Sequence, residues 1–243
     1  EKMKEIREKV FNRENMIITF IGNKKDYLHF KTNIDKYLEK INNKHYEEVL
    51  IDNKISCNSK AFVIDKKVNY IQEGFKLRTK IEDSLLCNII SNKYLMKKIR
   101  IDNGAYGAWA TDRGSYITLT TYRDPKIKET LSIFKELPDF IKNLNLTEEE
   151  LTNYKILTNN LDNPKSIFAK ANIAINNYLS YIDVKELQEE LDTMFKMKVT
   201  DLRKKSEVFK KGLDKSVLAI SSDKDTIKNN SDLFEEVEDF MSE

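Results

Sequence analysis

Cysteine, histidine and long apolar runs are scarce in this chain of 243 residues. Its two cysteines, Cys57 and Cys87, lie thirty positions apart. A disulfide framework would need more of them, so we expect two buried free thiols. No apolar run approaches the ~20 residues that a membrane-spanning helix needs, and no basic stretch followed by an apolar core marks a signal peptide. The sequence therefore predicts no membrane span.

The scarcity of histidine also argues against a metal site. Beside the two cysteines, the nitrogen ligands are His29 and His45, and no two of the four are spaced for one helical turn or one zinc knuckle. The inverted zinc motif H-x-x-E-H is approached at His45, but its second histidine is missing. Neither histidine lies in a glycine-rich elbow or beside a motif serine. We therefore predict no metal in this chain and ordinary polar roles for both histidines.

Charge of one sign does not dominate the chain. It has 42 lysines and arginines against 40 aspartates and glutamates, which leaves a formal net charge of +2. A dedicated nucleic-acid binder normally concentrates basic residues on one face, because neutralising phosphates supplies much of its affinity. The balance therefore predicts no nucleic-acid partner. With 40% hydrophobic residues, the chain can still bury a core of domain size.

A strand-then-helix pattern occurs near both ends of the chain. Residues 16–22 (MIITFIG) are apolar and β-branched, and a helical pattern follows in 24–41. Residues 216–221 (SVLAIS) are followed by a second helical pattern in 223–240. Two copies about 200 residues apart indicate two tandem domains of one kind, with only the tail of the first present.

The first residue is Glu1, and the opening EKMKEIREKVF reads as the middle of an amphipathic helix, so we interpret the sequence as a fragment. A polar stretch at 42–60 separates the two copies. We predict that residues 1–45 are the terminal strand and helix of a preceding homologous domain. Residues 55–243 are predicted to form the final domain.

Between these ends, strand and helix patterns follow each other without regular alternation. Residues 61–77 read as one or two strands, and 81–100 carry apolar residues at helical spacing. Residues 105–111 and 115–122 alternate with period two around a loop that ends in Gly114, as in a β-hairpin. These segments predict a sheet with at least one hairpin.

Helices are predicted for much of the rest. Asp124 before Pro125 suits a helix start, with aspartate as the N-cap, and Pro138 should end or kink that helix. Capping-box spacing marks two further helix starts, at Thr147 with Glu150 and at Asp183 with Glu186. The predicted fold class is therefore α+β, an antiparallel sheet backed by helices.

The distinctive segment is the run RIDNGAYG, in which Arg100 ends a long helix and Tyr106 begins a strand. Gly104 and Gly107 flank the tyrosine and permit close approach of another backbone or an extended ligand. The arginine and the tyrosine could donate to a peptide carbonyl, or to the oxyanion that develops during its hydrolysis. A structural reading stays open, in which Arg100 caps its own helix and Tyr106 packs beneath the sheet.

This segment resembles the C-terminal substrate-binding signature of the presequence proteases, a subfamily of the pitrilysin/insulysin-type zinc peptidases that includes falcilysin. In that signature an arginine is followed six residues later by the tyrosine of a G-A-Y-G turn, and Arg100 and residues 104–107 match it. The family's SYRDP is similar to TYRDP at 121–125, and the resemblance covers most of residues 55–243. Relatives usually carry a second glycine at the position of Asn103, which tolerates a left-handed backbone.

The resemblance implies domains like those of the mitochondrial processing peptidase. Four such domains form two bowl-like halves around a closed chamber. Zinc would lie in the first domain, so the zinc of the full-length enzyme would not be bound by this chain. Arg100 and Tyr106 would reach across the chamber to bind the substrate and its transition state. The substrate-binding turn would be shaped by Asn103, Gly104, Ala105 and Gly107.

The resemblance also implies partners and a place of action. The substrates would be unfolded peptides, such as targeting sequences or haemoglobin fragments, and the partner would be the N-terminal, zinc-bearing half of the same polypeptide. The isolated chain is expected to be inactive. The compartment would be the mitochondrion, apicoplast or food vacuole in a eukaryote, and the cytoplasm in a bacterium.

Two other functions stay open. The same fold also serves as a non-catalytic scaffold half in relatives of this class, and that function would need neither Arg100 nor Tyr106. A free-standing peptide- or RNA-binding module would instead use the aromatic residues of the predicted hairpin, which are Tyr106, Trp109, Tyr116 and Tyr122. Tight, salt-sensitive RNA binding by the isolated chain would favour that module.

Overall fold

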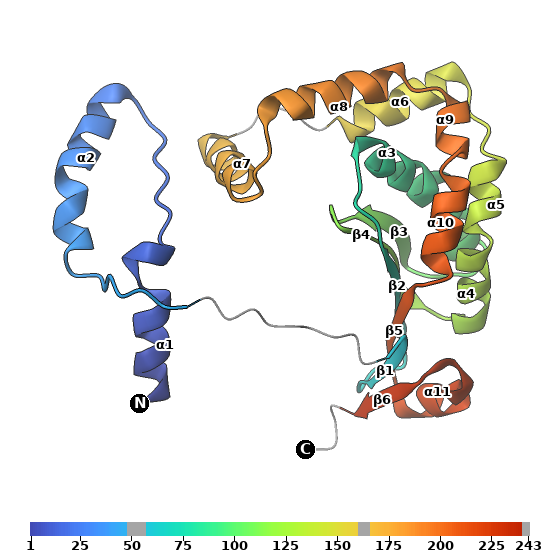
Figure 1. Cartoon of the computed structure of the whole chain (residues 1–243). Coiled ribbons are helices and arrows are strands. Elements are labelled where there is room, and N and C mark those ends of the chain that lie inside the picture. The colour runs from blue at the N-terminus through green and yellow to red at the C-terminus, as the bar shows by residue number, and fades with distance from the viewer. Residues whose placement is uncertain (48–56, 160–165, 240–243) are drawn as a thin grey trace. The chain divides into compact units, whose positions relative to one another are not determined.

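A computed structural model describes residues 1–47, 57–159 and 166–239 (Figure 1). The chain divides into two compact units. Unit 1 comprises Glu1–Lys54 with Asn163–Val184, and unit 2 comprises Ile55–Asp162 with Lys185–Glu243. The predicted domain boundary, between residues 45 and 55, falls almost entirely outside the described residues. Each unit is described by itself.

Unit 2 is built on one six-stranded sheet with the order β3-β4-β2-β5-β1-β6. The pairs β3–β4, β4–β2 and β2–β5 are antiparallel, whereas β1 runs parallel to both β5 and β6. The strand bounds are β1 Ser59–Val63, β2 Asn69–Lys76, β3 Gly107–Asp112, β4 Tyr116–Asp124, β5 Val217–Ser222 and β6 Glu236–Asp239.

The structure confirms the predicted α+β class and the predicted hairpin, which is β3–β4. The sheet is mixed, and the antiparallel prediction holds for its β3-β4-β2-β5 part. The parallel pairs arise because helix α11 (Lys224–Asn229) carries the chain back after β5, so that β6 starts in the same direction. β1 lies between these two strands.

One face of the sheet, the inner face, is covered by helices. Buried positions alternate along β2 at Asn69, Ile71, Glu73 and Phe75, as expected for a strand with one covered face. Figure 1 shows α3, α4, α5 and α10 on this side of the sheet. Their largest fully buried side chains include Phe134, Phe209, Leu85, Leu86 and Leu137.

The helices of unit 2 follow the predicted signals closely. Thr147 accepts from the Glu150 N–H at 3.1 Å, and the Glu150 carboxylate accepts from the Thr147 N–H at 2.9 Å, which confirms that capping box. The helix bounds are α3 Ile81–Ile89, η2 Ile90–Ile101, α4 Ile127–Lys135, α5 Leu137–Lys142, α6 Glu148–Thr158, α8 Val184–Lys196, α9 Val199–Arg203, α10 Ser206–Leu213, α11 and η4 Ser231–Leu233.

Two predictions near α4 have different outcomes. Pro138 lies in the first turn of α5, so the predicted break in the helix is confirmed. The prediction of Asp124 as N-cap is wrong, because α4 begins at Ile127 and Asp124 still pairs with Asn69 as the last residue of β4. Its carboxylate nevertheless accepts from the Lys126 N–H at 2.9 Å.

The two cysteines also differ from each other. Cys87 is a buried free thiol, as predicted, whereas Cys57 is only partly buried. Burial in the core raises the pKa of the Cys87 thiol, which keeps it protonated and unreactive. Across the described ranges, no helix is both long and apolar enough to cross a membrane.

Unit 1 contains α1 (Lys2–Val10), η1 (Arg13–Asn15), α2 (Lys24–Leu38) and α7 (Ile167–Leu179). The helix predicted after residue 22 is confirmed as α2. The strand predicted at 16–22 is wrong for this chain, since these residues pair with no other described segment. A strand needs a partner to satisfy its backbone groups. No described hydrophobic side chain of this unit is buried.

Candidate substrate-binding site

The site is built where a long helix turns into an edge strand. η2 continues α3 with wide π-type turns, and the Asp102 N–H donates to the Lys97 carbonyl, five residues back, at 2.9 Å. π-type turns are rare and frequently occur at functional sites. The Ala105 N–H then closes the helix end by donating to the Ile99 carbonyl at 3.1 Å.

Gly104 makes this turn possible. Its φ of +85° lies in the left-handed region, which L side chains adopt at a cost. A Cβ at this position would meet only Pro125 Cγ, at 3.9 Å, so the requirement for glycine comes from the backbone and not from lack of space. The neighbouring Asn103 places its side-chain nitrogen in a buried position without a hydrogen-bond partner among the described residues.

Arg100 points its side chain away from the core. It is exposed, and one guanidinium nitrogen lies 3.6 Å from the Met96 sulfur, a weak acceptor. In the described part of the chain, its guanidinium donates to no carbonyl at the end of its own helix. The structure therefore shows no capping role for Arg100, and most of its donors are unused.

Tyr106 does not pack beneath the sheet. Its side chain is 67% exposed, while its N–H donates to the Tyr122 carbonyl at 3.0 Å. Its ring meets the Tyr122 ring edge-on at 5.7 Å, and Tyr122 in turn contacts Tyr70 at 5.3 Å. No hydrogen bond or ring contact joins Tyr106 to Arg100. Of the predicted site residues, the structure thus places Arg100 and Tyr106 at opposite ends of one turn, both accessible.

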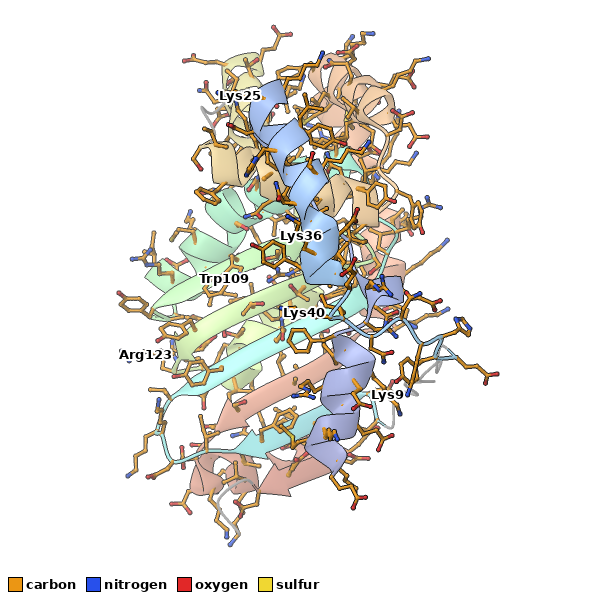
Figure 2. All side chains as sticks on the ribbon, turned by 90° about the vertical axis from the view of Figure 1, so that its left-hand side faces the viewer. Lys9, Lys25, Lys36, Lys40, Trp109 and Arg123 are labelled. Atoms are coloured by element: carbon orange, nitrogen blue, oxygen red, sulfur yellow. The ribbon has the colours of Figure 1, made fainter. Side chains whose placement is uncertain are left out.

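The aromatic residues gather on the face of the sheet opposite the helices, which we call the outer face. It is formed by the alternate positions of β2 to β5, including Tyr70, Gln72, Gly74, Trp109, Thr120, Tyr122 and Ala219. Figure 2 looks onto this face and labels Trp109 and Arg123. Gly107 lets the Trp109 ring lie against the strand, since a Cβ there would stand 3.0 Å from that ring.

At the free edge of β3, the backbone groups of Ala110 already have a hydrogen-bond partner within the fold. The Ser91 hydroxyl accepts from the Ala110 N–H at 2.9 Å and lies 3.2 Å from the Ala110 carbonyl. An extended peptide that added to this edge as another strand would need those same groups. The outer face and the Arg100–Tyr106 turn are therefore the more accessible surfaces for a peptide.

Arg123 is a site residue that the sequence did not reveal. Its guanidinium carbon lies 5.5 Å from the centre of the Tyr122 ring and 6.0 Å from that of Tyr106. Its φ is +51°, which is unusual for a residue with a side chain. No local signal predicts this, because it follows from a shift in the pairing of β4 with β2.

The side chains of the site can donate hydrogen bonds and stack against a ligand, but they do not form a metal site. Among the described residues, no three His, Cys, Asp or Glu side chains are placed to hold a metal ion. His29 is exposed on α2, and His45 is exposed and bonds Glu14 at 2.8 Å, so neither lies in unit 2 beside the turn. The site offers arginine donors, tyrosine hydroxyls and aromatic faces, which suit a peptide.

Comparison with known proteins identifies the family of the chain. The family model described as "PreP C-terminal domain" matches residues 59–223. "Protein HypA" of Clostridium perfringens is 28% identical over 98% of this chain and 25% of its own length. "Presequence protease 1, chloroplastic/mitochondrial" of Arabidopsis thaliana is 24% identical over 97% of this chain and 23% of its own length.

The fold is also found in solved structures. The peptidase M16 inactive domain from Pseudomonas fluorescens superposes with a TM-score of 0.59 at 14% identity, over 83% of this chain and 51% of that one. Such low identity shows a shared fold alone. The chain spans about a quarter of the length of the two curated relatives it matches.

Proposed function

Because the chain belongs to the PreP C-terminal domain family, we propose that it is the substrate-binding C-terminal part of a zinc-dependent oligopeptidase. The substrates would be unfolded peptides. The observation that carries this proposal is the Arg100–Tyr106 turn, where both side chains are exposed and leave most of their donors unused. These donors are therefore available to a ligand.

Arg100 and Tyr106 would act as donors to the substrate. The guanidinium presents five N–H groups, and the tyrosine hydroxyl one O–H, to a peptide carbonyl or to the oxyanion formed when it is attacked. Both are held by rigid elements, since the helix ends through backbone bonds at Asp102 and Ala105 and Tyr106 is bonded to β4. A rigid support matters because donors that are already oriented lose nothing at the moment of reaction.

The outer face offers room for the rest of the peptide. Its positions along β4 run from Tyr116 to Tyr122, which at about 3.4 Å per residue is roughly 20 Å. An extended peptide of about six residues has that length. Small residues at Gly74 and Ala219, both partly exposed, let a peptide backbone approach closely.

Zinc would have to come from elsewhere in a longer protein. The described residues of this chain supply no ligand cluster, so they do not fit a zinc site. In this proposal the N-terminal, zinc-bearing half provides the metal, and the present chain provides binding and orientation of the substrate. The chloroplastic or mitochondrial name of one relative and the bacterial source of the other match an organelle in a eukaryote or the cytoplasm in a bacterium.

Residues 1–45 would belong to a preceding homologous domain. Ile17, Ile18 and Ile21 are all more than two-fifths exposed although they are strongly apolar. Burying such side chains stabilises by about 1.5–3 kcal/mol each, so we infer that they form a strand in the sheet of the preceding domain. Ile17→Asp and Ile18→Asp, on the two faces of an extended strand, should then each prevent association of the chain with that part, whereas Thr32→Asp, on the exposed surface of α2, should weaken it much less. Equal effects would contradict the docking.

The experiment that tests the function is a peptidase assay. The chain alone, and the chain mixed with the preceding part of its polypeptide, are given a quenched fluorescent peptide with and without a zinc chelator. Activity is expected only in the mixture without chelator. Activity of the chain alone would overturn the proposal, because it would require a catalytic site in this chain.

The kinetics of point variants distinguish this function from a scaffold role. A scaffold role is suggested by the name of the inactive domain from Pseudomonas fluorescens. Arg100→Ala should lower kcat by roughly 10² if the arginine supports the oxyanion. Arg113→Ala removes the same charge from the exposed β3–β4 loop and serves as the control. Unchanged kinetics in Arg100→Ala would favour the scaffold half.

A further inference from the structure

Arg123 holds a costly backbone conformation. In the pairing of β4 with β2, Tyr122 lies opposite Tyr70 and Asp124 lies opposite Asn69, so Arg123 is an extra, bulged residue. Its φ of +51° is left-handed, a conformation that is unfavourable for a residue with a Cβ. Such strain persists only where the neighbours fix it, and it concentrates at functional sites.

The neighbours do fix it. Asp124 is 1% exposed, and its carboxylate accepts from the Thr130 hydroxyl at 2.7 Å and from the Lys126 N–H at 2.9 Å. The Asn69 side chain donates to the Asp124 carbonyl at 2.6 Å. These bonds fix the position of Asp124, the residue after the bulge. Arg123 is therefore the residue whose backbone departs from the strand conformation.

The bulge changes where the arginine points. Leu119 and Thr121 face the covered side of the sheet, so strict alternation would send residue 123 into the core. The bulge instead brings the guanidinium beside the rings of Tyr122 and Tyr106. The strain therefore has an identifiable result, a cation placed next to the tyrosine of the substrate-binding turn.

The guanidinium has no anionic partner among the described residues. Arg123 makes no ion pair and no side-chain hydrogen bond with them, and its guanidinium contacts the two tyrosine rings. It lines a hollow of about 470 Å³ with Lys67, Asp124, Asp223 and Asp225. Asp124 is bonded as described above, and Asp223 caps α11 and accepts from the Thr226 hydroxyl at 2.7 Å. These bonds come from neutral donors and leave both carboxylates charged, so the hollow holds three carboxylates beside two cations. The unpaired guanidinium of Arg123 beside the two rings, and not the charge of the hollow, is what favours a bound carboxylate.

We propose that Arg123 is a second substrate-binding residue, which binds a carboxylate of the peptide while the rings of Tyr106 and Tyr122 contact its apolar part. The planar fork of a guanidinium matches a carboxylate with two parallel hydrogen bonds. The carboxylate is either the C-terminal group or an Asp or Glu side chain. This inference rests on the proposed function, because it places the peptide at Tyr106.

The geometry limits where the carboxylate lies in the substrate. The guanidinium carbon of Arg123 lies 6.0 Å from the centre of the Tyr106 ring. An extended peptide advances about 3.4 Å per residue. The acidic group therefore lies within about two residues of the one that Tyr106 contacts. An acid farther along the peptide should make no difference.

The test compares acidic and neutral peptides in the assembled peptidase. One pair differs by Glu against Gln next to the cleaved bond, and a second pair ends close to that bond in a free acid or an amide. The parent protein should cleave the acidic member of at least one pair with roughly tenfold higher kcat/KM. Arg123→Gly and Arg123→Asn, both of which tolerate a left-handed backbone, should abolish that preference, so that the acidic and neutral members of each pair are cleaved with equal kcat/KM. The pair that responds identifies the source of the carboxylate.

Arg113→Gly is the matched control, because it removes the same side chain from the loop. A preference that survives in both Arg123 variants, or that disappears equally in the control, overturns the inference. Loss of a structural residue would also lower stability, whereas Arg123→Gly should raise Tm by relieving the strain.

If no mixture cleaves any peptide, the proposed function fails. The inference is then judged by titrating the chain itself with the same peptide pairs, where equal affinities for acid and neutral forms overturn it.

Discussion

Replacing Gly104 by alanine should separate the stability of the fold from the function of the turn. The φ of +85° penalises any side chain, while the added Cβ would meet only an ordinary contact at 3.9 Å. The cost is therefore that of the backbone alone, about 1–2 kcal/mol. In a unit of this size, that corresponds to a fall in Tm of roughly 2–8 °C.

The same change should have a larger effect on peptide hydrolysis. Gly104 connects the last helical turn, which carries Arg100, to the strand that begins at Tyr106. If the backbone relaxes toward a normal φ, the two donors move apart, and a displacement of about 1 Å can cost roughly 10²-fold in rate. We therefore expect kcat/KM to fall by roughly 10- to 100-fold.

Gly114 supplies the matched control. Its φ is +80°, it lies in the β3–β4 loop, and an added Cβ there would meet nothing within 4 Å. Gly114→Ala should lower Tm by a similar amount and leave kcat/KM unchanged. Thermal unfolding and peptide hydrolysis are measured on both variants. If both lose activity equally, or if Gly104→Ala loses stability alone, the turn does not orient the donors.

Three further predictions concern the stability of unit 2. Burial raises the pKa of Glu73 against the smaller lowering effect of the Ser216 hydroxyl, so its contribution to stability is present below the unfolded pKa and lost as pH rises through the folded one. Glu73→Gln should thus raise Tm more at pH 7 than at pH 4. Phe209→Ala should cost about 3–5 kcal/mol in urea unfolding, since Phe209 is fully buried and meets the Phe75 ring at 5.4 Å. Thr147→Ala should cost about 1 kcal/mol through loss of the helix cap, and Thr147→Ser should restore it.

The fold of unit 2 could be predicted because its signals are local. The period-two pattern and Gly114 are sufficient to define the β3–β4 hairpin, and the capping box at Thr147 fixes the start of α6. The parallel pairs escaped prediction, since the position of β1 between β5 and β6 depends on contacts between residues more than 150 positions apart. Local patterns carry no information on such pairings.

Unit 1 shows the opposite limit. The pattern at 16–22 indicates a strand, yet a strand forms only when another strand satisfies its N–H and C=O groups, and the described chain offers none. Residues 16–22 therefore have the composition of a strand but do not form one in this chain. The isoleucines of the segment are more than two-fifths exposed, as the proposed packing in the sheet of a preceding domain requires.

The site divides in the same way. Arg100, Gly104 and Tyr106 lie within seven residues, so one run of sequence reveals a helix end, a left-handed turn and a strand start. Arg123 joins them only through a register shift between β4 and β2, which is a property of the paired strands. The bulge moves one residue out of the alternation that would bury it. A cation next to Tyr106 thus requires both the local turn and the distant pairing, and a substitution that removes the bulge should move Arg123 without changing Arg100.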